Sequence, residues 1–259
     1  MSDESAPSLK VLVAVASYNE RETIPKLLDE IFRALPSADV LVIDDASPDG
    51  TGQYCDERAA SDPRLKVLHR RGKLGLGSAI LASFEYAASR GYDYLVGLDA
   101  DLSHPPEVIP ALLARASGED GMGGCDVAIG SRYIPGGRVV GWPLRRRISS
   151  ALVNRFARLL LGIPVRDASG GFRCYRVAAL AAVLESGLAA RGYSIFEEVL
   201  FRLAQRGARF SEVPYTFVDR TQGKSKLSLR ETIRAMQALF ALALGRLTPS
   251  RRQSSADPR

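Results

Sequence analysis

The stretch from Tyr94 to Asp101 reads YLVGLDAD and joins a short apolar run to two carboxylates one residue apart. The apolar run predicts a buried strand, because it is short, uncharged and follows the turn-forming pair Arg90-Gly91. Carboxylates this close repel each other and are costly to desolvate, so Asp99 and Asp101 call for a cation. Their oxygens suit Mg²⁺ or Mn²⁺, which keep water ligands and bridge to substrate phosphates. A solvated acidic turn is the alternative interpretation.

Outward from this stretch, the chain repeats an alternation of strand, polar strand end and helix. A second acidic strand end, VLVIDD at 40–45, favours a site built from strand ends over an isolated turn. The alternation predicts an α/β fold with a mostly parallel sheet, helices on both faces and ligands at the carboxyl edge. The expected strands are 9–16, 40–43, 65–69, 94–98, 127–130 and 210–218, with 167–175 returning to the sheet. The expected helices are 23–35, 51–60, 78–89, 105–116, 145–161, 195–206 and 229–247.

Length and composition favour one domain over residues 9–247, with flexible tails at 1–8 and 248–259. A hydrophobic fraction of 46% and a charged fraction of 25% are typical of globular proteins. The net charge of +6 is modest, and we expect no nucleic-acid partner. The polar N-terminus argues against a secretory signal, and no apolar run approaches the roughly 20 residues of a membrane span. Three widely spaced cysteines predict reduced thiols and a cytoplasmic location.

Seven polar clusters occur in an order and spacing that resemble family 2 glycosyltransferases. The clusters are SYNE at 17–20, DDASPDGT at 44–51, GLG at 75–77, DADLSHP at 99–105, GSRY at 130–133, SGGFR at 169–173, and Arg220 with GKSKL at 223–227. Together they look most like the polyprenyl-phosphate type, closest to dolichyl-phosphate (polyprenol-phosphate) mannosyltransferases, over residues 9–245. The resemblance implies the GT-A fold of nucleotide-diphospho-sugar transferases, with a mostly parallel, Rossmann-like sheet.

The first polar clusters are expected to bind a nucleotide-sugar donor. Tyr18 suits stacking on a flat base, and Glu20 suits accepting hydrogen bonds from ribose hydroxyls. Ala16 stands where the family usually has proline, and Asp44 is expected to orient neighbouring backbone. By resemblance, donor-binding residues are Tyr18, Glu20, Ile43, Asp45, Asp99, Ala100, Asp101, Arg132, Arg220 and Lys226.

The metal is assigned mainly to Asp101 as a direct ligand. Asp99 is expected to support the donor's ribose or the water shell of the metal, and Ser103 is a weaker oxygen ligand. His104 has no His or Cys partner and precedes two prolines, so it is expected to pack or to face solvent rather than to bind metal.

Arginines in the second half are expected to bind phosphate. Arg132 follows a strand and can grip a phosphate bidentately, while 145–147 (RRR) open a basic amphipathic helix. Arg132, Arg146 and Ser150 are assigned to the phosphate of a lipid acceptor, with Ile148, Leu152, Phe156 and Leu160 facing the membrane. A solvated helix start or simple membrane attraction is the alternative. Arg220 and Lys226 are expected on a mobile loop over the donor diphosphate, where Lys224 could replace either.

The expected reaction is transfer of mannose from GDP-mannose to a polyprenyl phosphate at the cytoplasmic face of a membrane. The phosphate oxygen is already anionic, so no strong base is needed, and single inverting displacement is expected. Catalysis is assigned to Asp101, Arg132, Arg220 and Lys226, which position groups and neutralise charge. Alternatives are UDP-glucose or another donor, a non-catalytic nucleotide-binding protein, and a membrane scaffold. A small membrane protein is a possible second anchor, and the roles of Asp167, Glu197 and Glu198 stay open.

Overall fold

The computed structural model describes residues 9–185, 187–188, 194–219, 237 and 240. Their main feature is a seven-stranded sheet of order β3-β2-β1-β4-β7-β5-β8. Neighbouring strands β1, β2, β3 and β4 are parallel, as are β5 and β8, while β7 runs antiparallel between β4 and β5. The α/β class with a mostly parallel sheet is therefore confirmed. The strands are β1 (Val11–Ser17), β2 (Asp39–Asp44), β3 (Leu65–His69), β4 (Tyr94–Asp99), β5 (Val127–Ser131), β7 (Arg173–Arg176) and β8 (Phe210–Pro214).

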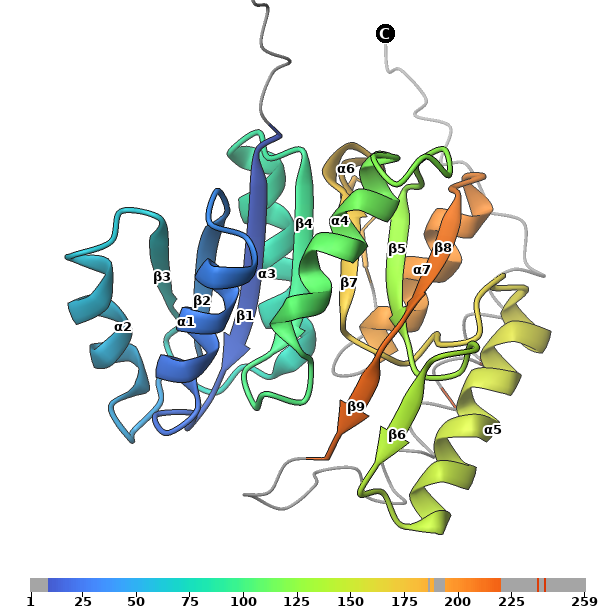
Figure 1. The fold of residues 1–259 in the computed structure, drawn as a ribbon, viewed down its shortest axis with the longest axis horizontal. Helices are drawn as coiled ribbons and strands as arrows, with labels where there is room; N and C mark the ends of the chain where they lie inside the picture. Colours follow the sequence, from blue (N-terminus) through green and yellow to red (C-terminus); the bar gives the residue numbers. More distant parts are fainter. Residues whose placement is uncertain (1–8, 186, 189–193, 220–236, 238–239, 241–259) are drawn as a thin grey trace, which may run out of the picture.

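Helices cover both faces of this sheet (Figure 1). Alternate residues of a strand point to opposite faces, and in β1 Val13 packs in the core with α1 and α4, while Leu12 packs in the core with α3, α6 and α7. Because both faces are covered, the central strands are apolar throughout rather than alternating. The helices are α1 (Ile24–Ala34), α2 (Thr51–Ala59), α3 (Leu76–Ser89), η1 (Pro106–Val108), α4 (Ile109–Ser117), α5 (Leu144–Leu161), α6 (Val177–Leu184) and α7 (Ile195–Gln205).

The expected strand 210–218 is wrong as a single element, because the chain divides it at Tyr215. β8 ends at Pro214, and β9 (Thr216–Val218) pairs instead with β6 (Arg138–Val140) in a separate parallel ribbon. Between the two strands, the Tyr215 amide donates to the Ser131 carbonyl and its carbonyl accepts from the Arg138 amide. Neither β6 nor α6 was expected from the sequence, and the expected helix 229–247 lies outside the residues described.

The β6-β9 ribbon and α5 lie near the carboxyl ends of β5 and β8, as Figure 1 shows. In the parallel part of the sheet, register sets Ser17 beside Asp44 and Ala16 beside Asp99. The ends of β1, β2 and β4 therefore lie side by side. The fold thus gathers the polar clusters at one edge.

Candidate active site

Backbone strain marks the carboxyl ends of β1, β2 and β4. Among the described residues, the non-glycine residues with positive φ are Asn19 (φ 61°), Ala46 (φ 56°) and Leu102 (φ 61°). Each lies just beyond one of these three strands. A non-glycine residue in this left-handed region is strained, and such strain concentrates at functional sites. The strand ends are thus held in unusual conformations where ligands bind in open α/β sheets.

Asp44 holds the loop after β2 in place. It is buried and accepts hydrogen bonds from the Ser17 hydroxyl (3.2 Å) and from the amide (3.1 Å) and hydroxyl of Ser47. The loops after β1 and β2 are also tied directly, because the Glu20 amide donates to the Thr51 hydroxyl at 3.0 Å. Asp44 therefore orients neighbouring backbone, as the sequence analysis expected.

The four residues expected around the nucleotide lie at the ends of β1 and β2. Asp45 is buried and forms an ion pair with Arg70 at 2.7 Å. It also accepts a hydrogen bond from the amide of Gly75 at 3.0 Å, and Gly75, with a φ of 90°, is the residue directly before α3. Lys73, from the same turn, lies 3.9 Å from the ring centroid of Tyr18. Ile43 is buried in the core beneath α3. Half-buried Glu20 accepts the Thr23 hydroxyl at 3.0 Å.

The loop after β4 is shaped by its own side chains. The Ser103 amide donates to Asp101 Oδ1 at 3.1 Å, and the Asp99 amide donates to Nδ1 of His104 at 3.0 Å. The imidazole is buried and stacks on Phe172, with ring centroids 5.1 Å apart. Burial lowers the pKa of His104, although Asp99 and Asp101 oppose the shift, so the neutral ring accepts a hydrogen bond. The expected packing role of His104 is confirmed, and its solvent-facing alternative is wrong.

The residues of this loop fit a hydrated divalent cation. Within the described ranges, no three His, Cys, Asp or Glu side chains form a metal cage. Asp101 and Asp99 are half-buried, while the hydroxyl of Ser103 beside them is buried with no hydrogen-bond partner there. One or two carboxylates plus water and substrate phosphate oxygens are the ligands that Mg²⁺ ordinarily takes. Asp101, with the hydroxyl of Ser103, suits such a site.

Arg132 and Asp167 form a buried ion pair. Nε and Nη2 of Arg132 each donate to a carboxylate oxygen of Asp167 at 2.7 Å, and the Arg132 amide adds a third bond at 3.0 Å. Burial would raise the pKa of Asp167, but the Arg132 guanidinium outweighs it and holds this pKa below its ordinary value. The Nε–Nη2 fork expected to grip a phosphate is therefore occupied by Asp167. The open role of Asp167 is thereby resolved as the partner of Arg132.

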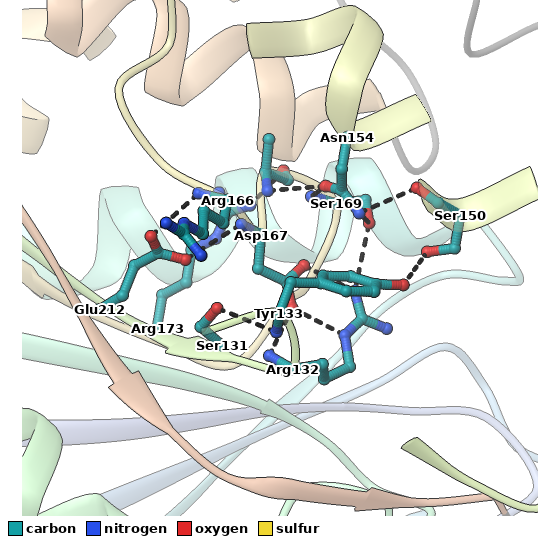
Figure 2. Close-up of polar contacts among 11 residues, drawn as sticks. Ser131, Arg132, Tyr133, Ser150, Asn154, Arg166, Asp167, Ser169, Arg173 and Glu212 are labelled. Carbon is teal, nitrogen blue, oxygen red and sulfur yellow. Dashed lines mark hydrogen bonds and ion pairs between the residues drawn. The ribbon is translucent and has the colours of Figure 1, made fainter. Parts of the chain in front are cut away.

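A polar network fixes the segment that carries Asp167 (Figure 2). Buried Asn154 of α5 accepts the amides of Ala168 and Ser169 through Oδ1, and its Nδ2 donates to the Ser169 hydroxyl. Glu212 of β8 accepts the amides of Arg166 and Asp167. The segment is thus held between α5 and the edge of the sheet. Neither Asn154 nor Glu212 was expected from the sequence, because nothing in the local sequence marks either one.

The three residues assigned to the acceptor phosphate lie around two aromatic rings. The guanidinium of Arg132 lies 5.2 Å from the centroid of Trp142, and that of Arg146 lies 4.1 Å from it. The ring centroid of Tyr133 lies 5.4 Å from the guanidinium of Arg132, and the Tyr133 hydroxyl donates to the Ser150 hydroxyl at 2.8 Å. Arg146 also pairs with Asp219 at 3.0 Å. The structure brings Arg132, Arg146 and Ser150 together, whereas Arg220, Lys224 and Lys226 lie outside the described residues.

The exposed face of α5 differs from the one expected. Leu144, Ile148 and Leu152 form an exposed apolar row at four-residue spacing, and Leu159 is also exposed. Phe156 does not belong to this face, because it packs on the core and stacks on Phe240 at 6.2 Å. Leu160 is only half exposed. No helix in the described part of the chain is long and apolar enough to cross a membrane.

Glu197 and Glu198 are buried in the first turn of α7. Glu198 pairs with Arg202, one turn later, at 2.6 Å. Burial raises the pKa of Glu197 from 4.5 to about 7, with Arg173 opposing the shift. Glu198 thus contributes an internal ion pair, and Glu197 is a carboxyl group that titrates near neutrality.

We expect Glu197→Gln to stabilise the protein more at about pH 8.5 than at about pH 5.5. The folded state holds a proton that the unfolded state loses, so stability falls as pH rises from 4.5 to about 7 and stays lower above it. The variant escapes this loss, which is of the order of 3 kcal/mol at full ionisation. Thermal unfolding at both pH values measures the difference. An equal change in Tm at the two would contradict it.

Comparison with known proteins identifies the class of this fold as the nucleotide-diphospho-sugar transferases. The chain belongs to glycosyl transferase family 2, whose family model matches residues 12–184. The expected GT-A fold is confirmed by solved glycosyltransferases. Glucosyl-3-phosphoglycerate synthase from Mycobacterium tuberculosis with UDP matches with a TM-score of 0.61 at 20% identity, over 94% of this chain and 82% of that one. A mannosyltransferase from Pyrobaculum calidifontis with GDP-Man and Mn²⁺ matches with a TM-score of 0.60 at 18% identity, over 91% and 64%.

Two curated relatives are more similar in sequence. Undecaprenyl-phosphate mannosyltransferase from Micrococcus luteus is 44% identical over 220 residues, which are 85% of this chain and 88% of that protein. Polyprenol monophosphomannose synthase from Mycolicibacterium smegmatis is 43% identical over 223 residues, 86% of this chain and 82% of that protein. The expected assignment to enzymes is therefore confirmed, and the chain is a glycosyltransferase.

Proposed function

We propose that this glycosyltransferase moves mannose from GDP-mannose to a polyprenyl phosphate at the cytoplasmic surface of a membrane. The observation that carries the proposal is that two groups of residues, one acidic and one basic, lie at the same edge of the sheet. Acidic strand ends at Asp99 and Asp101 suit a metal-bound diphosphate, and the Arg132–Trp142–Arg146 group beside the exposed apolar row of α5 suits a phosphate on a lipid. The names of the two relatives, both polyprenyl-phosphate mannosyltransferases, support the same sugar and acceptor.

On the donor side, the proposal assigns the nucleotide to the ends of β1, β2 and β4. Tyr18 stacks on the base, Glu20 accepts the ribose hydroxyls, and Ile43, Asp45, Asp99 and Ala100 complete the pocket. Asp101, with Ser103 as a weaker ligand and Asp99 in support, would hold a divalent cation, which would supply positive charge beside the departing diphosphate. Arg220 and Lys226 add charge from the segment outside the described residues.

On the acceptor side, Arg146, Ser150 and the Nη1 edge of Arg132 receive the phosphate. Asp167 holds the Arg132 guanidinium still through two bonds of 2.7 Å, so the group is oriented before substrate arrives. A phosphate monoester is already anionic near neutral pH, so it attacks the anomeric carbon without a strong base. One in-line displacement inverts that carbon and leaves GDP.

A lipid acceptor requires the site to reach a membrane surface. The exposed row on α5 (Leu144, Ile148, Leu152) is flanked by exposed Arg145 and Arg155, an arrangement that suits shallow binding to anionic lipid. A separate small membrane protein would serve as a second anchor. Peripheral binding through α5 is the attachment that we propose.

We expect the protein to float with anionic liposomes and to float less at high salt. Each basic residue near the surface adds roughly 1 kcal/mol, and the apolar row adds insertion. Replacing Leu144, Ile148 and Leu152 together by Ser should reduce flotation strongly, because the inserted surface is lost. Met122→Ser removes an equally exposed apolar side chain far from α5 and should change nothing. Equal flotation of the triple variant and the parent would contradict docking through α5.

A comparison of nucleotide-sugar donors tests the chemistry. Radiolabelled GDP-mannose, UDP-glucose and other donors are incubated with polyprenyl phosphate, detergent and Mg²⁺ or Mn²⁺, and label in the organic extract is counted. The proposal expects label from GDP-mannose, and NMR of the product should show inverted anomeric configuration. Extraction of label from UDP-glucose alone would replace the donor assignment. Nucleotide binding without transfer from any of these donors would contradict the proposed acceptor.

A further inference from the structure

Several buried hydrogen-bonding groups without a partner lie in the region of Arg132 and Arg146. Of the eight buried side-chain atoms that have no hydrogen-bond partner among the described residues, four belong to this group: the hydroxyls of Ser103 and Tyr215, the indole nitrogen of Trp142 and Nε of Arg146. We call these four residues the hydrogen-bond wall. Trp142 and Arg146 can only donate, and the two hydroxyls can also donate. A buried donor left unpaired is costly, so a wall of them indicates a ligand that offers acceptors.

Aromatic contacts make this wall continuous. The ring of His104, next to Ser103, meets the rings of Tyr215 and Phe217 edge-on at 5.9 and 6.1 Å. The ring centroids of Phe217 and Trp142 lie 5.1 Å apart, and the guanidinium of Arg146 lies 4.1 Å from the centroid of Trp142. The wall therefore runs from the loop after β4 to the start of α5. It connects the edge that carries the acidic strand ends to the arginine group.

Tyr215 occupies the middle of the wall. It lies where β8 gives way to β9, and its backbone is held on both sides, by the carbonyl of Ser131 and the amide of Arg138. Burial raises the pKa of its phenol. The charge of Arg132 opposes this rise, and the charges of Asp167 and Asp99 add to it. The hydroxyl is therefore protonated at neutral pH and available as a donor. A neutral donor whose backbone is fixed to Ser131, the residue before Arg132, suits one oxygen of a phosphate.

We propose that Tyr215 is a substrate-contacting residue whose phenol donates a hydrogen bond to a phosphate oxygen held beside Arg132. The proposal rests on the proposed function for the identity of that phosphate, which belongs either to the prenyl monophosphate or to the nucleotide diphosphate. The phenol carries no charge. Its hydrogen bond therefore orients the phosphate and does not neutralise charge on the leaving group. Trp142 donates to the same ligand from the arginine side.

Tyr215→Phe tests this inference, because it removes one oxygen and keeps the ring contacts with His104 and Phe172. A hydrogen bond to a charged group predicts a loss of about tenfold or more in affinity for the phosphate that it contacts. Calorimetry with farnesyl phosphate and, separately, with GDP measures that loss without requiring turnover. Weaker binding of farnesyl phosphate alone assigns the lipid phosphate, and weaker binding of GDP alone assigns the diphosphate. Unchanged affinity for both overturns the proposal.

Thermal unfolding separates this role from a structural one. The phenol has no partner to lose, so Tyr215→Phe should leave Tm unchanged or higher. Tyr92→Phe is the matched control, since its hydroxyl bonds to Asp39 at 2.7 Å at the opposite end of the sheet. It should lower Tm and leave both affinities intact. A fall in Tm for Tyr215→Phe as large as that of the control would show a structural hydroxyl. If the parent binds farnesyl phosphate but transfers no mannose, the proposed function fails while the test of Tyr215 stands.

Discussion

Asp101→Asn is expected to reduce transfer by about two to three orders of magnitude while the protein remains folded. The substitution removes the charge that would hold the cation against the departing diphosphate. It keeps an oxygen at Oδ1, so the hydrogen bond from the Ser103 amide at 3.1 Å can persist and the loop after β4 keeps its shape. Steady-state transfer assays with circular dichroism check both halves of the expectation, and excess EDTA should abolish activity of the parent.

Asp93→Asn is the control for charge removal at the other end of the same strand. Asp93 precedes β4 and accepts the Lys10 amide at 2.7 Å, far from the acidic strand ends. Its turnover should match the parent's. Near-normal turnover of Asp101→Asn, or full activity in EDTA, would remove the metal from the account.

Asp167→Asn is expected to destabilise the protein by about 3–5 kcal/mol and to impair transfer. The carboxylate is fully buried and receives three hydrogen bonds from Arg132, so the variant leaves a buried guanidinium without its counter-charge. The side-chain NH₂ group of the asparagine would also place its donors against the N–H donors of Arg132. Urea unfolding measures the stability, and the KM for polyprenyl phosphate should rise because Arg132 is no longer oriented.

Two further variants separate pairing from orientation. Asp29→Asn breaks a surface pair with Arg58 at 2.6 Å, and less than about 1 kcal/mol should be lost. In Asp167→Asn combined with Arg132→Met, much of the stability should return, because no unpaired charge is left, while transfer stays low. A double variant as active as the parent would show that Arg132 serves the fold alone.

The sheet could be predicted because its signals are local. Strands such as 40–43 and 94–98 are short apolar runs that end in carboxylates, and parallel pairing then brings their ends together without any knowledge of distant contacts. The same applies to the helices at 23–35 and 145–161, whose apolar spacing and first-turn residues lie within the segment itself.

The contacts on the acceptor side could not be predicted in this way, because they join distant residues. Nothing near Arg132 indicates that its fork pairs with Asp167, 35 residues later, and Asn154 looks like an ordinary polar helix residue until it meets the amides of Ala168 and Ser169. The division of the strand at Tyr215 had one local signal, Pro214, which cannot donate a ladder hydrogen bond. The buried side of α5 was misjudged at Phe156, where contact with the core decides exposure.

The most direct test of the account compares two acceptors that differ by one group. The purified protein is incubated with radiolabelled GDP-mannose, a divalent cation and either polyprenyl phosphate or the corresponding unphosphorylated polyprenol, in anionic detergent micelles or liposomes. We predict extractable mannosyl lipid with the phosphate and none above background with the alcohol. Equal labelling of both acceptors, or transfer only to water-soluble acceptors, would contradict it.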